Sequence, residues 1–148
     1  MFESYLFAAL EGTLIQNGEP VAGATIIREA MLGDESKTFT DQAITDEQGH
    51  FRFPEMKTCS LRAKFMLEKV VFQQLLLIRG DERVEIYDYV RRSFTQGENI
   101  RVKGLRYLPE PLQLSCNLDE PSFYQDTENR VVAGVCSVKG LKRFKEAE

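Results

Sequence analysis

The sequence predicts an all-β fold, an antiparallel Greek-key β-sandwich, from two features of its pattern. Apolar and polar side chains alternate along short segments, most clearly over residues 61–67, where Leu61 and Phe65 would share one face and Arg62 and Lys64 the other. Glycine, proline, asparagine and aspartate separate these segments at short intervals, as hairpin turns require. Helical periodicity is scarce, so we expect the fold to be built from strands.

The expected strands are apolar or alternating runs bounded by turn residues. In chain order they are residues 5–15, 22–29, 37–45, 50–53, 60–67, 70–79, 83–90, 100–105, 112–118 and 131–138. The turns between them fall at residues 17–18, 33–34, 48–49, 80–81, 97–98 and 119–121. Residues 60–74 also fit a helical period, so a strand is favoured there and a helix is the alternative.

The length and composition of the chain fit a single domain. It has 148 residues, of which 43% are hydrophobic and 28% charged, and no linker rich in proline, glycine or serine divides it. A chain of this size buries about two thirds of its unfolded surface without needing disulfides or metal. We therefore expect one sandwich over residues 1–148, with a core at about residues 5–110 and an extension at about 111–148.

Two motifs support this fold by resemblance. Residues 18–27 read GEPVAGATII and residues 45–54 read TDEQGHFRFP. Together they resemble the start of carboxypeptidase-regulatory-like domains, which belong with the transthyretin-like (prealbumin-like) seven-stranded sandwiches, a relative of the immunoglobulin-like architecture. The similarity covers about the first third of the chain and extends to uncharacterised bacterial proteins that carry such a start. It implies a fold and no particular function.

Charge and hydropathy limit the partners. The net charge is −4, so the chain lacks the electrostatic footprint of a nucleic-acid-binding protein. Residues 1–60 hold 4 basic and 10 acidic side chains, a balance of −6, and could present a negative face to a basic protein. The uninterrupted apolar runs, such as the one at residues 75–78, are far short of a membrane span. We expect no membrane insertion.

The amino terminus predicts a location. Residues 1–10 lack the basic region of a signal peptide and reach Glu11 quickly, so they are expected to form a first strand. Cytoplasmic residence is therefore the default, and a periplasmic location is the alternative if a signal has been removed from this chain.

The resemblance also argues against catalysis. Hydrolases of the purine pathway built on this fold depend on several histidines and a terminal Tyr-Arg-Gly-Ser motif, intradiol dioxygenases need two histidines, and zinc carboxypeptidases also need more than one. This chain has only His50 and ends without that motif. We expect a protein that is not an enzyme, with no cofactor and no metal.

The cysteines leave two readings open. The chain contains Cys59, Cys116 and Cys136 without a C-x-x-C spacing, so a zinc site is not expected. Cys116 would share a face with Leu112 and Leu114, which suits a buried thiol. Cys116 and Cys136 lie on strands that could be neighbours, so a disulfide is the alternative if the chain is exported.

The candidate binding site is residues 117–130, expected to be a long exposed loop. It combines acidic and aromatic side chains: Asp119, Glu120, Phe123, Tyr124, Asp126 and Glu128. We expect a non-enzymatic protein-binding domain, with a toxin-neutralising immunity protein or a secretion-system accessory as its specialisation. A carbohydrate or cell-envelope binding module is the alternative, although the absence of tryptophan counts against it. A third class is a hydrolase with a site around His50.

Overall fold

The computed structural model describes residues 3–32, 38–59, 71–91, 99–102, 106–109, 111–127 and 130–144, and in these ranges it contains strands and no helix. The all-β prediction is confirmed. The predicted strand at residues 60–67 lies outside the described ranges. The ambiguous stretch 60–74 is described only from Val71, where it is strand.

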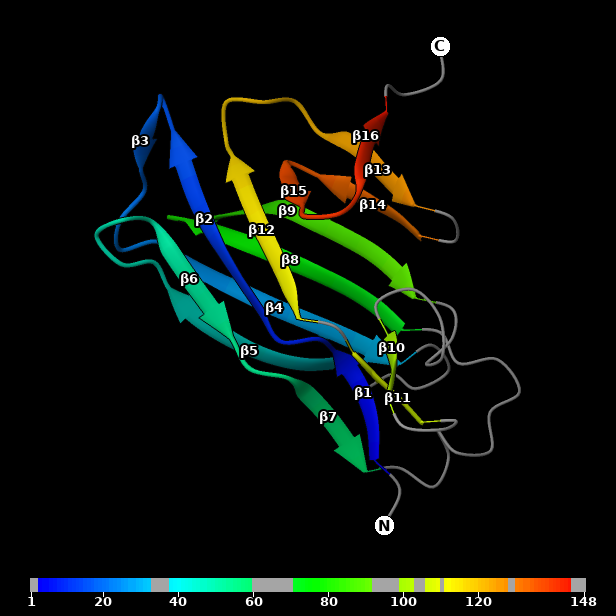
Figure 1. The fold of residues 1–148 in the computed structure, drawn as a ribbon. Helices are drawn as coiled ribbons and strands as arrows, with labels where there is room; N and C mark the ends of the chain where they lie inside the picture. The colour runs from blue at the N-terminus through cyan, green and yellow to red at the C-terminus, as the bar shows by residue number, and fades with distance from the viewer. Residues whose placement is uncertain are drawn as a thin grey trace.

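Seven strands form one antiparallel sheet (Figure 1). In order across the sheet they are β16 (Lys142–Phe144), β13 (Phe123–Thr127), β14 (Arg130–Gly134), β9 (Glu82–Arg91), β8 (Val71–Arg79), β4 (Thr25–Leu32) and β5 (Thr38–Ile44). This sheet therefore combines four strands from residues 25–91 with three strands from residues 123–144.

A second sheet has five strands, and two short ribbons complete the described fold. The five are β15 (Cys136–Val138), β12 (Leu112–Asn117), β2 (Leu10–Gln16), β3 (Glu19–Pro20) and β6 (His50–Phe53). One ribbon pairs β1 (Glu3–Phe7) with β7 (Met56–Cys59), and the other pairs β10 (Asn99–Val102) with β11 (Arg106–Pro109). Residues 103–105 of one predicted strand lie outside the described ranges.

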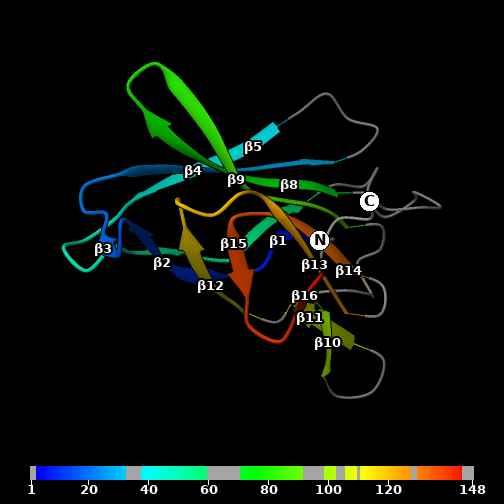
Figure 2. The same cartoon turned by 90° about the horizontal axis from the view of Figure 1, so that it is seen from above.

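The two larger sheets form two layers around one core (Figure 2). Alternate residues of β2, β6 and β12 point inward, as Leu14, Phe51 and Leu114 show by their burial. Ile26 and Leu75 of the seven-stranded sheet belong to the same apolar cluster. The period-two pattern of the sequence therefore marks the inner face of each sheet.

The strand predicted at residues 5–15 is two strands. β1 ends at Phe7 and β2 begins at Leu10, and the break lets β1 pair with β7 while β2 pairs with β6, β3 and β12. Both sides of the break are apolar and buried. Because both segments are buried, the hydrophobic pattern of the sequence continues across the break between β1 and β2 and does not reveal it.

The strand predicted at residues 131–138 is also two strands, one in each sheet. β14 ends at Gly134 and β15 begins at Cys136. Gly134 has φ 128°, and a side chain there would collide with the carbonyl oxygen of Ile86. That oxygen accepts a hydrogen bond of 3.0 Å from the Val135 amide, so a glycine allows the close approach at which the chain changes sheets.

One pairing departs from the antiparallel prediction. β12 runs parallel to β2, with Leu112 opposite Leu10 and Asn117 opposite Ile15. Parallel neighbours need a long connection. Here the connection from β2 to β12 contains four strands of the seven-stranded sheet, β4, β5, β8 and β9. Local turn signals cannot reveal such a pairing.

Candidate functional site

The loop predicted at residues 117–130 is a turn followed by a strand. β12 ends at Asn117, a turn follows, and β13 occupies Phe123–Thr127 between β14 and β16. The prediction of one long exposed loop is wrong, because backbone pairing on both sides fixes this segment in the sheet. Glu128 lies outside the described residues.

One acidic residue of the turn, Asp119, holds neighbouring backbone through its carboxylate. A carboxylate oxygen of Asp119 accepts a hydrogen bond of 2.5 Å from the amide of Asn17, a residue with φ 55°. The Asp119 amide donates to the side chain of Asn117 at 3.0 Å, and the Glu120 amide donates to the Asn117 carbonyl at 3.3 Å. Asp119 therefore ties the turn after β12 to the turn after β2.

The aromatic residues belong to the strand. Phe123 is opposite Gly134 and Tyr124 opposite Ala133, and both side chains are half-buried. Between them and the end of the strand, Gln125 is buried and bonds to β15: its amide nitrogen donates to the Cys136 carbonyl at 2.6 Å. Asp126 is placed by register opposite Val131 and Lys142. The five predicted residues that the structure describes are thus divided between a turn and a sheet.

Tyr124 leads to a surface that spans the seven-stranded sheet. A cross-strand row runs from Tyr124 through Ala133, Asp88 and Gln74 to Glu29. The row beside it contains Val90, Phe72 and Met31, and the row on its other side contains Glu85, Leu76 and Ile27. These residues of β4, β8, β9 and β13 make up a surface that we call the outer face: Ile27, Glu29, Met31, Phe72, Gln74, Leu76, Ile78, Glu85, Asp88, Val90 and Tyr124.

The outer face is unusually apolar for a sheet surface. Phe72 is 41% exposed and Val90 39% exposed, and they are directly opposite each other on β8 and β9. An antiparallel sheet with one wet side normally carries polar residues there. The sequence offered one signal for this surface: the run at residues 75–78 has apolar side chains for both faces of β8.

Carboxylates lie among these apolar side chains. Glu29 accepts a hydrogen bond from the Gln74 amide nitrogen at 2.7 Å and lies 3.8 Å from a guanidinium nitrogen of Arg83. Partial burial, followed by the hydrogen bond and the negative charge of Asp88, raises the pKa of Glu85 above its ordinary value. Glu85 also lines a cavity of about 190 Å³ with Tyr124. The outer face is therefore apolar with a negative centre.

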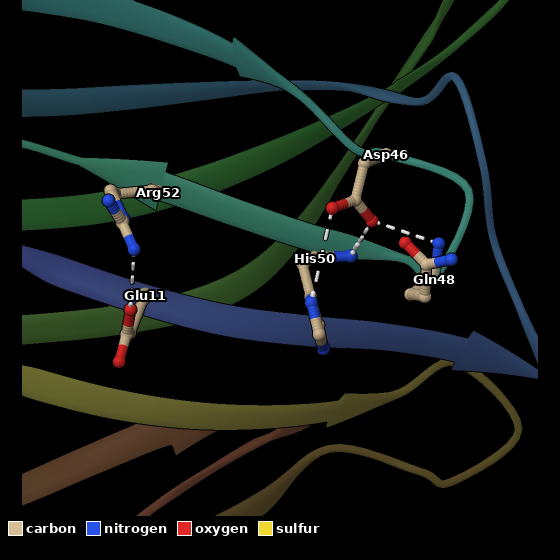
Figure 3. A network of polar contacts seen from close by, with 5 residues as sticks. All are labelled: Glu11, Asp46, Gln48, His50 and Arg52. Carbon is tan, nitrogen blue, oxygen red and sulfur yellow. Dashed lines mark hydrogen bonds and ion pairs between the residues drawn. The ribbon is translucent and has the colours of Figure 1, made fainter.

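A second concave surface lies beside strands β2, β6 and β12 of the five-stranded sheet and the end of β5. It is a cavity of about 590 Å³, lined by Glu11, Gly12, Thr13, Ala43, Ile44, Asp46, His50, Phe51, Arg52, Gln113 and Leu114. Figure 3 shows two contacts across it: Arg52 is 3.4 Å from Glu11, and the His50 ring nitrogen Nδ1 is 3.9 Å from the Asp46 carboxylate.

His50 is an exposed residue at the start of β6, with 62% of its side chain accessible. Its Asp46 neighbour is engaged by the turn, because Asp46 Oδ1 accepts hydrogen bonds of 2.9 Å from the amides of Gln48 and His50. In the described part of the chain, no group of three or more histidine, cysteine, aspartate or glutamate residues is arranged to hold a metal ion.

The two late cysteines are bonded. Cys116 and Cys136 form a disulfide between the antiparallel neighbours β12 and β15, where they are directly opposite each other and fully buried. The bond joins the sheet at the place where the chain has just crossed from the seven-stranded sheet. It therefore fixes the carboxy-terminal strands to the five-stranded sheet.

Comparison with known proteins gives one match. Residues 10–121 match the model of a family described as a domain of unknown function, DUF6795. The chain belongs to the DUF6795 family. No curated protein and no solved structure matches it.

The DUF6795 match covers the strands from β2 to β12 and the turn after them. The outer-face residues of β4, β8 and β9 lie inside it, whereas Tyr124 and Cys136 lie beyond it. None of the described residues forms a helix long and apolar enough to cross a membrane.

Proposed function

We propose that this domain is a non-enzymatic protein-binding module whose contact surface is the outer face. The apolar row Met31–Phe72–Val90 carries the proposal: Phe72 and Val90 are exposed neighbours, Met31 beside them is half-buried, and contiguous exposed apolar side chains mark interaction sites on soluble proteins. The row lies on three paired strands, so it is held rigid without a partner. A preformed surface of this kind loses little conformational entropy when it binds.

The charge of the surface specifies the partner. Asp88 lies in the row beside Val90 and Glu85 in the row beyond it, and the like-charge contact between these two carboxylates would be relieved by a cation placed beside them; Glu29 already has Arg83 beside it. The partner is therefore a protein with a basic and apolar contact region. We propose a toxin-neutralising immunity protein or a secretion-system accessory as the role of the domain.

The test uses position 72 as a probe. A photo-crosslinking amino acid at Phe72, in the protein expressed in its native host, should capture one protein, and the same probe at Ser115 should not. Ser115 is an exposed position on the outer side of the other sheet, opposite Thr13 and Ser137. Capture of the same protein from both positions, or of none, would contradict the assignment of the outer face.

The purified partner then allows a quantitative measurement. We expect Phe72→Glu to weaken binding by at least about thirtyfold, as the loss of a central apolar contact does, and Ser115→Glu to leave it unchanged. The affinities of both variants can be measured by isothermal titration calorimetry. Equal affinities for the wild type and Phe72→Glu would rule out this surface.

The cavity beside His50 favours a second function, a carbohydrate or cell-envelope binding module. Its volume of about 590 Å³ is in the range of ligand sites, and Glu11, Arg52 and Gln113 offer the polar groups that hydroxyls need. A glycan array followed by titration with Gln113→Ala would test this function. An array without a signal would remove it.

We also propose that the two sheets form a transthyretin-like Greek-key sandwich, on the support of the glycine and proline motifs at residues 18–27 and 45–54. The disulfide favours the periplasmic alternative over a cytoplasmic location, since such bonds persist in oxidising compartments. In intact cells, a thiol-alkylating reagent should leave Cys116 and Cys136 unlabelled when they are bonded to each other.

A further inference from the structure

We propose that β5 is a strand-addition site, where an extended segment of the partner protein pairs with the open edge of the seven-stranded sheet. This inference rests on the proposed function and specifies how the partner binds. A strand added beside β5 would extend the outer face, because Thr38 and Thr40 of β5 continue the rows of Met31 and Glu29. Backbone pairing and the apolar row would then act on one partner.

The other edges of the two large sheets are protected. β3 has two residues, one of them Pro20, and β16 has three residues, including Lys142 and Arg143. β6, the other edge strand beside β2, has four residues including Arg52, and Asp46 already bonds the backbone of His50, accepting from its amide at 2.9 Å and donating to its carbonyl at 3.0 Å. β15 has three residues, and its backbone is already bonded to the Gln125 side chain, which accepts a hydrogen bond of 2.7 Å from the Val138 amide. Short strands, prolines and basic residues are devices that prevent edge pairing.

β5 lacks these devices. It has seven residues without proline, lysine or arginine, and its ladder with β4 is regular from Thr38 to Ile44. Within the described residues, no strand pairs with its other side. Its one charged residue, Asp41, is engaged by Arg28 at 2.6 Å. Among the described edges of the two large sheets, β5 is the one suited to accept a strand.

The hydrogen-bond phase shows which backbone groups point outward. The Thr45 amide donates to the Ala24 carbonyl at 2.9 Å, and bonded pairs recur at every second residue of an antiparallel ladder. Ala43 and Asp41 therefore direct their backbone groups toward β4. Thr40, Gln42 and Ile44 direct theirs to the open edge, and the side chains of these three residues are exposed and uncharged.

The side chains of β5 favour another protein over a second copy of this chain. In the register that pairs all seven residues of two β5 strands, the two Asp41 residues would be opposite each other, which is unfavourable for like charges. Asp41 keeps 34% of its side chain exposed. A basic side chain on the added segment would complement it, and an apolar one would cover Ile44, which is 63% exposed.

Amide exchange of the free protein is the first test. Measured by NMR, the amides of Thr40, Gln42 and Ile44 should exchange at least about a hundredfold faster than those of Asp41 and Ala43, whose bonds lie within the sheet. Equal protection of the two sets would show that the edge is already covered and would overturn the proposal.

Addition of a peptide is the second test. The probe is a synthetic peptide of the length of β5, with alternating valine and threonine and a central arginine. It should slow exchange at Thr40, Gln42 and Ile44. Gln42→Pro removes an outward amide and should weaken peptide binding by about tenfold or more, whereas Gln42→Ala keeps the amide and should stay within about twofold. No slowing at saturating peptide would overturn the proposal.

Two further outcomes separate this inference from the proposed function. If the partner still crosslinks at Phe72 and binds Gln42→Pro as tightly as the wild type, the outer face stands and the edge is rejected. If sedimentation shows a dimer that Gln42→Pro abolishes, the edge belongs to a second copy of the chain, which overturns the assignment to a partner. Thermal unfolding of both Gln42 variants checks that they fold.

Discussion

At the scale of single residues, the core contains a charge. Arg28 points inward from β4 and is fully buried, with its guanidinium 5.1 Å from the ring centre of Phe7 and 4.8 Å from that of Phe53. It donates two hydrogen bonds to Asp41, at 2.9 and 2.6 Å, and one to the Ala8 carbonyl at 3.2 Å. Arginine cannot lose its charge in a protein, so these contacts must satisfy it.

We predict that Asp41→Ala lowers the free energy of unfolding by about 3 kcal/mol, because it leaves the Arg28 charge buried without its carboxylate. Chemical denaturation measures the change. The double variant Arg28→Met with Asp41→Leu removes both charges and should recover much of the loss. A single variant as stable as the wild type would show that Arg28 is satisfied by its other contacts.

The raised pKa of Glu85 predicts a pH dependence. The folded protein holds the proton of the Glu85 carboxyl group more tightly than the unfolded chain does. The stability that Glu85 contributes is therefore fully present below the ordinary pKa of glutamate and is lost as the pH rises through the raised pKa. Glu85→Gln should therefore raise the melting temperature at about pH 7 and have little effect below about pH 4. Glu82→Gln, on the same strand, is the control. An identical effect of Glu85→Gln at both pH values would contradict the assignment.

At the scale of elements, turn geometry fixes the connection from β5 in one sheet to β6 in the other. Gly49 has φ 77°, its carbonyl accepts the Leu14 amide at 2.9 Å, and an added Cβ would collide with the Leu14 carbonyl oxygen. The sequence motif at residues 45–54 placed this turn correctly, because Gly49 supplies the positive φ that the turn needs.

We predict that Gly49→Val destabilises the fold by at least about 2 kcal/mol, because a β-branched residue adopts positive φ poorly and would also displace β2. Gly18→Ala is the matched control, since Gly18 has φ 74° but no atom near an added Cβ, and it should cost less. Thermal unfolding compares the two. A Gly49 variant as stable as the Gly18 variant would show that the close approach is unimportant.

At the scale of the molecule, the chain crosses between the sheets and is secured where it arrives. β14 belongs to one sheet and β15 to the other, and the disulfide joins β15 to β12 across 20 residues of sequence. A covalent link stabilises a fold mainly by restricting the unfolded chain. Here it also links β15 covalently to its antiparallel neighbour β12.

Replacement of both Cys116 and Cys136 by alanine should lower the free energy of unfolding by about 3 kcal/mol, the value for a loop of this size. Denaturation in the presence of a reductant should give a similar loss for the wild type and none for the double variant. Insensitivity of the wild type to reductant would show that the bond does not contribute to stability.

The sequence by itself determined the all-β class, the short strands and the tight turns, because period-two alternation and turn residues act over a few positions. Only the tertiary structure decided that residues 5–15 and 131–138 each divide between sheets, that β12 is parallel to β2, and that residues 123–127 are a strand. These features depend on contacts between distant segments. The outer face emerged in the same way, because strands far apart in sequence bring Tyr124, Asp88 and Glu29 into one row.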